Sequence, residues 1–512
     1  MRRFKIFIAK KVLLVRAALC ATMALAAMMC VGVVRAEQPN IIIIFPDDQG
    51  ATDLGIYGFD SNVDTPTLDH LAAHGALMHA GYSSSPKCVP SRSGLMTGRI
   101  QNEIGVVINK DGPLPLTLPN GEPLLIAPHY MKQLGYRTGQ IGKWSLGRTD
   151  AYFVGERGFD DYYSGSNLHY EINYDLEGNA VERQEVTDRR NRIIVQGEAA
   201  EAFIEKNHTQ PFFLYLAFYG PHLPRIEKDD PYYLNFPEVN YPNYTDEMND
   251  IRRQGLALIK AMDDAVAGVM EKLRAHGIEE NTLIFYAPDN GGSVKYKNEV
   301  GGPGHLQKAN GSENVPLRGE KGTLWEGGIR VPMLAYWKGT IPAGSVINEP
   351  VWTLDFIASA ISAGGGSPKP ELDGVNLLPR LTGAVEQIIR PTPLYWDHPP
   401  SIAIRNGDWK LHRYANMDFL FNLKSDPLEL TNLVSQNPEK HKALEQELMQ
   451  WRASLPEKGK VELKDANGGI YINGAPKGTP VDPRYKIAGA SSPAIAYPAP
   501  IKMANENNET IH

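Results

Sequence analysis

Residues 40–50 read NIIIIFPDDQG, an apolar run followed at once by a polar loop. A short and nearly continuous run of β-branched residues is typical of a strand that is buried on both faces. Two later stretches have the same form: PFFLYLAF (211–218) runs into YGPH, and TLIFYA (282–287) runs into PDNGG. In parallel sheets ligands bind beyond the carboxyl ends of the strands, so these three polar loops mark the candidate site.

Helical patterns separate these strands. The clearest one places apolar residues three or four positions apart and ends at Gly277; its members are Leu256, Ile259, Met262, Val266, Val269 and Leu273. After about residue 385, IAIRNGDWKLHRY and FLFNLKSDPLELTNL predict short strands and a turn, and 436–454 predict a helix. We therefore expect an α/β fold with a large, mostly parallel mixed sheet sandwiched by helices, and a smaller C-terminal subdomain with an antiparallel sheet.

The first 36 residues differ in composition from the rest. A basic start leads into the apolar run ALCATMALAAMMCVGVV (18–34) and then VRA, with small residues before a cut after Ala36. A membrane anchor is the alternative, but the short run and the cleavage-like end favour a signal peptide. The expected division is a signal peptide at 1–36, a main domain at 37–385, a C-terminal subdomain with a small sheet and a helix at 386–455, and an irregular tail at 456–512 rich in Gly, Pro, Ala and Ser.

Charge narrows the class of partner. The whole chain has a formal net charge of −7. Loss of the leader removes seven basic residues and no acids, which leaves 45 basic against 59 acidic residues, or −14. Such a protein has no general attraction for nucleic acid or anionic membranes, so an anionic substrate needs a local basic pocket. No later stretch is long and apolar enough to span a bilayer, and no stable membrane anchor is expected.

Cys88, in PKCVPSRSGLMTGR (86–99), is the one cysteine that remains after the leader is lost. It therefore cannot form an internal disulfide in the mature chain. The usual interpretations of such a cysteine are one half of a disulfide, a metal ligand or a thiolate nucleophile.

Short oxygen donors follow two of the predicted strands: Asp47 and Asp48 in PDDQG, and Asp289 and Asn290 in PDNGG. Turn chemistry alone explains one such cluster. Two clusters at strand ends favour a metal, and hard oxygen ligands suit calcium or magnesium better than zinc.

Three basic residues are candidates for a positive pocket, namely Arg92 in PSR, Lys143 in GKW and Lys321 in LRGEKGTLW. Singly each is an ordinary surface charge. Beside a metal they would form a positive pocket suited to a small tetrahedral anion. His222, in GPHLP, is either a proton donor or a hydrogen-bonded histidine at a strand end, and its position favours a function.

The block CVPSRSGLMTGR resembles the signature of the type I sulfatases, members of the alkaline phosphatase superfamily: Cys, any residue, Pro-Ser-Arg, then Thr-Gly-Arg. The resemblance covers most of residues 38–435, and it implies an alkaline phosphatase-like fold with residues 37–385 as the catalytic domain. Further blocks resemble the family in family order, including PNIIIIFPDDQG, VDTPTLDHLAAHGALMHAGY, GYRTGQIGKW, PFFLYLAFYGPHLP, DDAVAGVMEKLRAHGIEENTLIFYAPDNGG and LRGEKGTLWEGGIRVPML.

The resemblance implies a role for each candidate residue. Cys88 is converted to formylglycine (3-oxoalanine) by a formylglycine-generating enzyme or an anaerobic sulfatase-maturing enzyme. One hydroxyl of the hydrated aldehyde attacks the sulfur, and the second later expels sulfate. Arg92 and the metal favour the ionised hydroxyl, Lys143 and Lys321 hold sulfate oxygens, and His222 or Lys321 protonates the departing alcohol. One calcium ion is held by Asp47, Asp48, modified Cys88, Asp289 and Asn290.

The sequence departs from the family at Ser145. The family commonly reads GKWHLG, where the histidine supports the nucleophile, and this chain reads GKWSLG. A serine hydroxyl can donate one hydrogen bond but carries no positive charge and relays no proton at neutral pH. The ionisation and collapse steps are then either slower or served by another residue.

Candidates for substrate recognition lie outside the family blocks. An aromatic ring that stacks on a sugar and a cation for a second anionic group would suit a sulfated polysaccharide. An ordinary loop role is the alternative for each of these residues, which are His169, Tyr170, Arg225, Lys295, Lys297, His305 and Trp325.

The sequence therefore predicts a sulfuric ester hydrolase that acts on a sulfated carbohydrate outside the cytoplasm, in a bacterial periplasm or as a secreted protein. Two alternatives stay open. One is a phosphonate or phosphate monoester hydrolase of the same superfamily. The other is a non-catalytic protein that binds sulfated glycans and keeps Cys88 unmodified.

Overall fold

The structure is a computed structural model of the chain. It describes residues 38–165, 167–242, 244–294, 309–415 and 417–460, together with two short paired strands, β17 (Tyr471–Ile472) and β18 (Ala475–Pro476). The predicted signal peptide (1–36) and most of the predicted tail (456–512) lie outside the described residues.

Ten strands of the described chain form one mixed sheet in the order β11-β2-β10-β9-β1-β8-β4-β5-β6-β7. The five strands from β9 to β5 run parallel to one another, and antiparallel pairs lie toward both edges. The strands are β1 (Asn40–Ile44), β2 (Ala76–Met78), β4 (Arg137–Gly142), β5 (Asp161–Gly165), β6 (His169–Tyr174), β7 (Ala180–Thr187), β8 (Phe212–Ala217), β9 (Thr282–Tyr286), β10 (Leu334–Tyr336) and β11 (Ser345–Ile347).

The three strands predicted from continuous apolar runs are β1, β8 and β9, and they are neighbours. Ile41 of β1 pairs with Phe213 of β8 and with Leu283 of β9. All residues of the three strands are buried, as expected for strands that are covered on both faces. Their shared register brings their carboxyl ends, and the polar loops that follow, to the same edge of the sheet.

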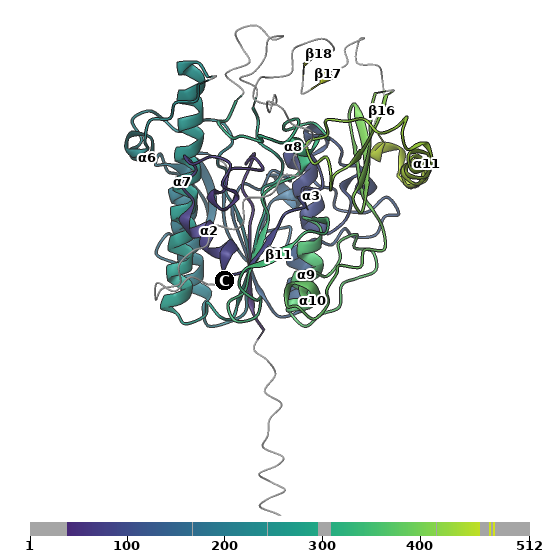
Figure 1. Cartoon of the computed structure of the whole chain (residues 1–512). Helices are drawn as coiled ribbons and strands as arrows, with labels where there is room; N and C mark the ends of the chain where they lie inside the picture. The colour runs from purple at the N-terminus through teal and green to yellow at the C-terminus, as the bar shows by residue number, and fades with distance from the viewer. Residues whose placement is uncertain are drawn as a thin grey trace, which may run out of the picture. The chain divides into compact units, whose positions relative to one another are not determined.

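Helices cover both faces of the sheet, because successive side chains of a strand point to opposite sides. Ile42 and Ile44 join one core with α2 (Pro66–Ala73), α5 (Arg192–Asn207) and α7 (Asp246–Ala275). Ile41 and Ile43 join a second core with α3 (Cys88–Thr97), α4 (Ala127–Gln133), α9 (Asp355–Ala363) and α10 (Leu378–Leu381). Figure 1 shows α2 and α7 on one side of the sheet and α3, α9 and α10 on the other.

Helix α7 contains all six apolar positions of the predicted helical pattern, each of them buried. Among the described residues, the other helices are α6 (Pro231–Asn235), α8 (Glu326–Ile329) and α11 (Pro438–Ser454), and the short 3-10 turns are η1 (Gly55–Tyr57), η2 (Gln101–Ile104), η3 (Asn109–Asp111), η4 (Asp150–Tyr152) and η7 (Glu457–Gly459). Within the described part of the chain, no helix is both long enough and apolar enough to cross a membrane.

A second, antiparallel sheet follows the main one. Its strands are β13 (Leu394–His398), β14 (Ser401–Asn406), β15 (Trp409–Tyr414) and β16 (Met417–Asn422). Its apolar face shares a core with α11 and with Tyr82 and Trp352, which lie in the small pair β3 (Gly81–Tyr82) and β12 (Val351–Trp352). The predicted fold class, a large mixed sheet between helices with a small C-terminal antiparallel sheet, is confirmed.

Candidate active site

The polar residues that follow β1 and β9 meet beyond the carboxyl ends of these strands. The main-chain N–H of Asp48 donates to Asp289 Oδ1 at 3.1 Å, and Asn290 Nδ2 donates to Asp48 Oδ1 at 2.7 Å. Asp47, Asp48, Asp289 and Asn290 are all buried. The structure therefore brings together the two oxygen-donor clusters that the sequence predicts.

The turn at Asp48 is unusual, since its φ of 64° lies in the left-handed region. Aspartate tolerates this region better than most residues, but the conformation still has a cost that the surroundings must offset. Asn310 helps to do so, because its Nδ2 donates to the main-chain oxygen of Asp48 at 2.8 Å. The turn directs the carboxylates of Asp47 and Asp48 to the same point, where both approach Cys88.

Cys88 is the first residue of α3, and its Sγ lies 3.4 Å from Asp47 Oδ1 and 3.8 Å from Asp48 Oδ1. The helix ends at Gly98, which adopts a φ of 66° and donates its N–H back into the last turn, so the Thr-Gly-Arg part of the motif terminates the helix. Burial, reinforced by Asp47, raises the pKa of the Cys88 thiol to about 12. A free thiol in this position is protonated at neutral pH.

Arg92 lies one turn further along α3, where it is fully buried. Its guanidinium binds Asp289 Oδ2 through Nε at 3.0 Å and through Nη2 at 2.9 Å. Nη1 also donates to the Tyr215 hydroxyl at 3.0 Å and to the main-chain oxygen of Lys143 at 3.4 Å. Arg92 thus ties α3, the loop after β4 and the loop after β9 to one another.

Two lysines face the same carboxylates. Lys143, in the loop after β4, binds Asp47 through Nζ. Lys321 Nζ lies 2.6 Å from Asp48 Oδ2 and 3.3 Å from Cys88 Sγ. Burial lowers the pKa of each ammonium, but the neighbouring carboxylates outweigh it and the net pKa of both lysines is raised. Both side chains are therefore cationic.

His222 follows β8 and completes the cluster. Its Nε2 lies 3.6 Å from Asp48 Oδ2, and its Nδ1 lies 2.7 Å from the main-chain oxygen of Leu223, close enough to donate to it. Burial lowers its pKa, although Asp47 and Asp48 act in the opposite direction. Ligand atoms of Asp47, Asp48, Cys88 and His222 all lie within 4.8 Å of one another. The structure thus brings together every residue predicted for the catalytic and metal roles.

The donor set fits a divalent cation. Three carboxylates converge here, and the pKa of Asp289 is raised to about 7 by burial and by the neighbouring Asp47. The buried Oδ1 of Asn290 has no protein hydrogen-bond partner. Carboxylate oxygens together with one unsatisfied amide oxygen suit a hard cation.

Comparison with known proteins identifies the chain. Residues 39–366 match the family model described as Sulfatase, and residues 319–454 match the model described as N-sulphoglucosamine sulphohydrolase, C-terminal. The chain belongs to the sulfatase family. It is a sulfuric ester hydrolase of the alkaline phosphatase superfamily, so the predicted family and enzyme class are confirmed.

Named sulfatases and a solved structure are similar to most of this chain. N-acetylgalactosamine-6-sulfatase of Canis lupus familiaris is 30% identical over 402 residues, which is 73% of this chain and 72% of the relative. Arylsulfatase A of Homo sapiens is 29% identical over 430 residues, 78% of this chain and 79% of the relative. The crystal structure of Ps i-CgsB superposes with a TM-score of 0.69 at 28% identity, covering 84% of this chain and 96% of that one. Ps i-CgsB has also been solved with k-i-k-neocarrahexaose (TM-score 0.67, 28% identity, 81% and 93% covered).

One residue predicted for sugar binding is placed differently in this sulfatase. Trp325 is 2% exposed, and its ring packs against His412 and Phe419 of the small sheet, with Arg318 over one face. The predicted role of Trp325 is wrong, because a ring enclosed by other side chains cannot stack on a sugar. Its place is in the contact between the segment after Lys321 and the small sheet.

The other predicted recognition residues divide into three groups. His169 and Tyr170 line a pocket beside the site. Arg225 is half-buried and donates to Gln254 Oε1 and to the main-chain oxygen of Ala309, so it belongs to the loop packing. Lys295, Lys297 and His305 lie outside the described residues.

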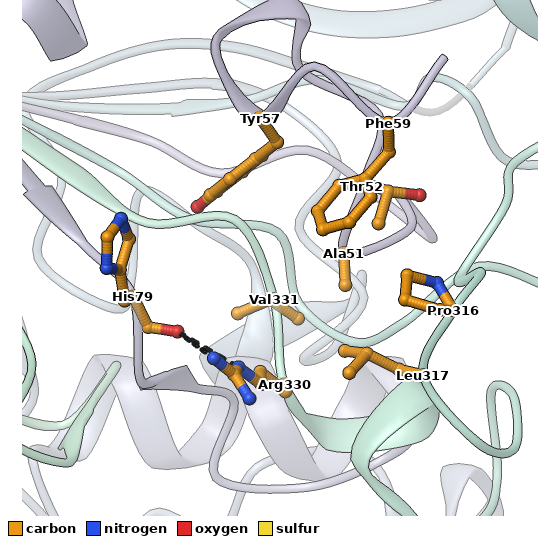
Figure 2. A pocket seen from close by; sticks show the side chains of 9 residues that line it. All are labelled: Ala51, Thr52, Tyr57, Phe59, His79, Pro316, Leu317, Arg330 and Val331. Carbon is orange, nitrogen blue, oxygen red and sulfur yellow. Dashed lines mark hydrogen bonds between the residues drawn. The ribbon is translucent and has the colours of Figure 1, made fainter. Parts of the chain in front are cut away.

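A cavity beside the loop at Ala51 and Thr52, just after Asp48, is too small for a sugar. Figure 2 shows it between Thr52, Tyr57 and Val331, with Arg330 donating to the main-chain oxygen of His79. Its volume of about 10 Å³ is at the lower limit of what one water molecule needs. Larger pockets lie beside Ser145 and involve Asn109 and Arg148. The sequence reasoning missed both residues, although Arg148 continues the GKWSLG block by one position.

Proposed function

We propose that this sulfatase removes sulfate from a sulfated carbohydrate, using formylglycine made from Cys88 and one calcium ion. The cluster around position 88 supports the proposal most directly. Three carboxylates face three cationic side chains, so the cluster is close to neutral by itself. A divalent cation would give it a net charge of +2, which suits the binding of a sulfate ester anion.

The residues that would hold the calcium are Asp47, Asp48, Asp289, Asn290 and position 88. With calcium bound and position 88 converted, the hydrated aldehyde would supply the nucleophilic hydroxyl, and calcium would supply positive charge for the sulfate group. The buried thiol of unmodified Cys88 would be a poor substitute, because burial and Asp47 keep it protonated.

The other residues of the cluster position and stabilise charge. Arg92 is anchored by Asp289 and Tyr215, so its guanidinium is held rigidly beside position 88. The ammonium groups of Lys143 and Lys321 are placed to hold sulfate oxygens.

His222 and Lys321 are the candidates for protonating the departing alcohol. If Nδ1–H of His222 donates to the main-chain oxygen of Leu223, Nε2 faces the cluster and can exchange a proton there. Lys321 lies nearer to position 88, at 3.3 Å from Sγ. We assign the general acid to His222 and the sulfate-holding role to Lys321, since the Lys321 ammonium already binds Asp48.

The similar proteins support a carbohydrate as the substrate. One relative is named for a sulfated amino sugar and one structural neighbour was solved with an oligosaccharide. We further propose that the chain is exported, most simply to a periplasm, by a signal peptide at residues 1–36. Conversion of Cys88 would then require a formylglycine-generating or anaerobic sulfatase-maturing enzyme as a partner.

The test uses protein from a host able to convert Cys88, incubated with sulfated mono- and oligosaccharides and with matched phosphate and phosphonate monoesters. We expect release of sulfate from sugars, loss of release after treatment with a chelator, and no release by Cys88→Ala. Faster hydrolysis of the phosphorus esters would instead support the phosphonate or phosphate monoester hydrolase. Binding of sulfated glycans without any hydrolysis would support the non-catalytic alternative.

A further inference from the structure

Two pockets lie side by side along the loop that follows Lys143. The Arg148 pocket has a volume of about 310 Å³ and is lined by Asn109, Gly112, Thr149 and Tyr152 together with Ser145, Gly147 and Arg148. The His169 pocket has a volume of about 190 Å³ and includes Asn167, His169, Glu171 and Glu185 together with the same three loop residues. Ser145, Gly147 and Arg148 therefore form a ridge between the two pockets.

Both pockets adjoin the cluster at position 88. Asn109 of the Arg148 pocket accepts a hydrogen bond at 3.1 Å from the main-chain N–H of Val89, the residue after Cys88. Asn167 of the His169 pocket accepts from Arg192 at 3.5 Å, and Arg192 also donates to the main-chain oxygen of His222. The linings of the two pockets therefore contact the residue after Cys88 and, through Arg192, His222.

Arg148 lines both pockets, but the other charged groups of the two linings differ. Among the described residues that line the Arg148 pocket, Arg148 is the one that carries a formal charge, and its neighbours offer neutral hydroxyl and amide groups. The His169 pocket contains two carboxylates: Glu171, which binds Arg183, and Glu185, which lies 3.6 Å from His169 Nδ1. Carboxylates accept hydrogen bonds from neutral sugar hydroxyls and repel anions, whereas an arginine binds an anionic group.

The ridge is held in an unusual conformation. Ser145 has a φ of 60° and Gly147 a φ of 131°, both in the left-handed region. A side chain at Gly147 would collide with Tyr152 and Pro113, which lie 2.4 and 3.0 Å from the position of a Cβ atom. Such strain at a serine marks a place where the surrounding structure fixes the main chain, next to the exposed Arg148.

Another pocket in the described part of the chain suits an anionic sugar poorly. It has a volume of about 480 Å³ and lies beside Tyr232 and Phe236. Its cation, Lys260, is bound to Asp264 at 2.7 Å and lies 3.6 Å from Asp64, so the lining has a net negative charge. None of the residues that line it belongs to the cluster at Cys88.

We propose that the substrate is an oligosaccharide lying across the Ser145–Arg148 ridge, and that Arg148 selects a second anionic group on it. This inference rests on the proposed sulfatase activity and adds the substrate class. The scissile sulfate lies at position 88, the second anionic group, a sulfate or a carboxylate, lies in the Arg148 pocket, and uncharged sugar hydroxyls face Glu171 and Glu185.

The test compares kcat/KM of wild-type protein, Arg148→Ala and Arg148→Lys on oligosaccharides relative to 4-nitrophenyl sulfate. One pair of probes is neocarrahexaoses with fewer and with more sulfate groups; the other is chondroitin 6-sulfate hexasaccharide before and after reduction of its carboxyl groups. We expect the wild type to prefer the more anionic member of one pair. A preference within the neocarrahexaose pair would identify the second anionic group as a sulfate, and a preference within the chondroitin pair would identify it as a carboxylate. Arg148→Ala should lower that preference at least about tenfold, and Arg148→Lys should lower it less.

The matched control is Arg274→Ala, which removes one exposed arginine at the end of α7 and should leave the preference unchanged. If wild type and Arg148→Ala release sulfate and prefer the more anionic oligosaccharide equally, the inference about Arg148 is overturned and the proposed sulfatase activity stands. Hydrolysis of 4-nitrophenyl sulfate without hydrolysis of any oligosaccharide would overturn it as well. Absence of hydrolysis of every sulfate ester would instead refute the proposed function on which the inference rests.

Discussion

Replacement of Arg92 by methionine tests whether the contacts of this arginine stabilise the site and support sulfate release. The guanidinium is fully buried and makes two contacts with Asp289, at 3.0 and 2.9 Å, and one with the Tyr215 hydroxyl at 3.0 Å. Methionine fills much of the space but leaves the Asp289 carboxylate and the Tyr215 hydroxyl buried without this partner. Loss of one partner of a buried ion pair typically costs about 3–5 kcal/mol of the free energy of unfolding.

Urea unfolding of Arg92→Met in the presence of a chelator should show this loss. Added calcium should reduce the difference from wild type, because the cation would also pair with Asp289. Sulfate release measured where the variant is folded should fall about 10²–10³-fold, the usual effect of removing a donor that stabilises developing charge.

Arg252→Met is the matched control. Arg252 is also a buried arginine, and it binds Asp53 and Asp60 at 2.8 Å each, away from Cys88. We expect a similar loss of stability and retention of most activity in the folded protein. The reasoning would be refuted if Arg92→Met were as stable as wild type, or if it hydrolysed sulfate esters as fast as Arg252→Met.

Three further predictions concern pH, metal and the small sheet. Burial lowers the pKa of His398 to about 4, so the unfolded chain binds one more proton than the folded chain between pH 6.5 and 4. Acidification through this window should therefore lower the free energy of unfolding by about 3 kcal/mol. Urea unfolding of His398→Asn should show a smaller loss than wild type, and a loss equal to that of wild type would count against the prediction. Chelation should lower the melting temperature, and calcium should restore it more than an equal concentration of potassium; an unchanged melting temperature would argue against the metal site. Lys410→Met should destabilise the protein by about 3–5 kcal/mol, because it leaves Glu326 and Glu429, each 2.9 Å from Lys410 Nζ in a fully buried cluster, without their cation. The control is Lys424→Met, which changes an exposed lysine. Equal unfolding midpoints for Lys410→Met and Lys424→Met would contradict the prediction.

The central part of the fold could be predicted from the sequence because its signal is local. The runs at 40–45, 211–218 and 282–287 are continuous because β1, β8 and β9 are covered on both faces. The order of strands toward the edges could not be predicted, since short strands such as β2 (Ala76–Met78) and β10 (Leu334–Tyr336) pair through contacts distant in the sequence.

The same distinction applies to the site. Residues at the carboxyl ends of neighbouring parallel strands lie close together, whatever the conformation of the loops that follow. Lys321 contacts Cys88 from 233 positions away in the sequence, and it was predicted from its resemblance to a family block. Trp325 was predicted wrongly because its sequence gives no sign of the rings of His412 and Phe419 that enclose it. Arg148 was missed because its pocket exists only where η3 and η4 fold against the loop after Lys143.

The chemical state of position 88 tests the central claim most directly. Protein from a host able to modify it can be digested, and the peptide across residues 80–99 analysed by mass spectrometry before and after treatment with a thiol reagent and with a hydrazide. We predict the mass of the aldehyde form, reaction with the hydrazide and no alkylation of Cys88. An intact thiol at Cys88 in protein that still releases sulfate from its substrate would contradict the account.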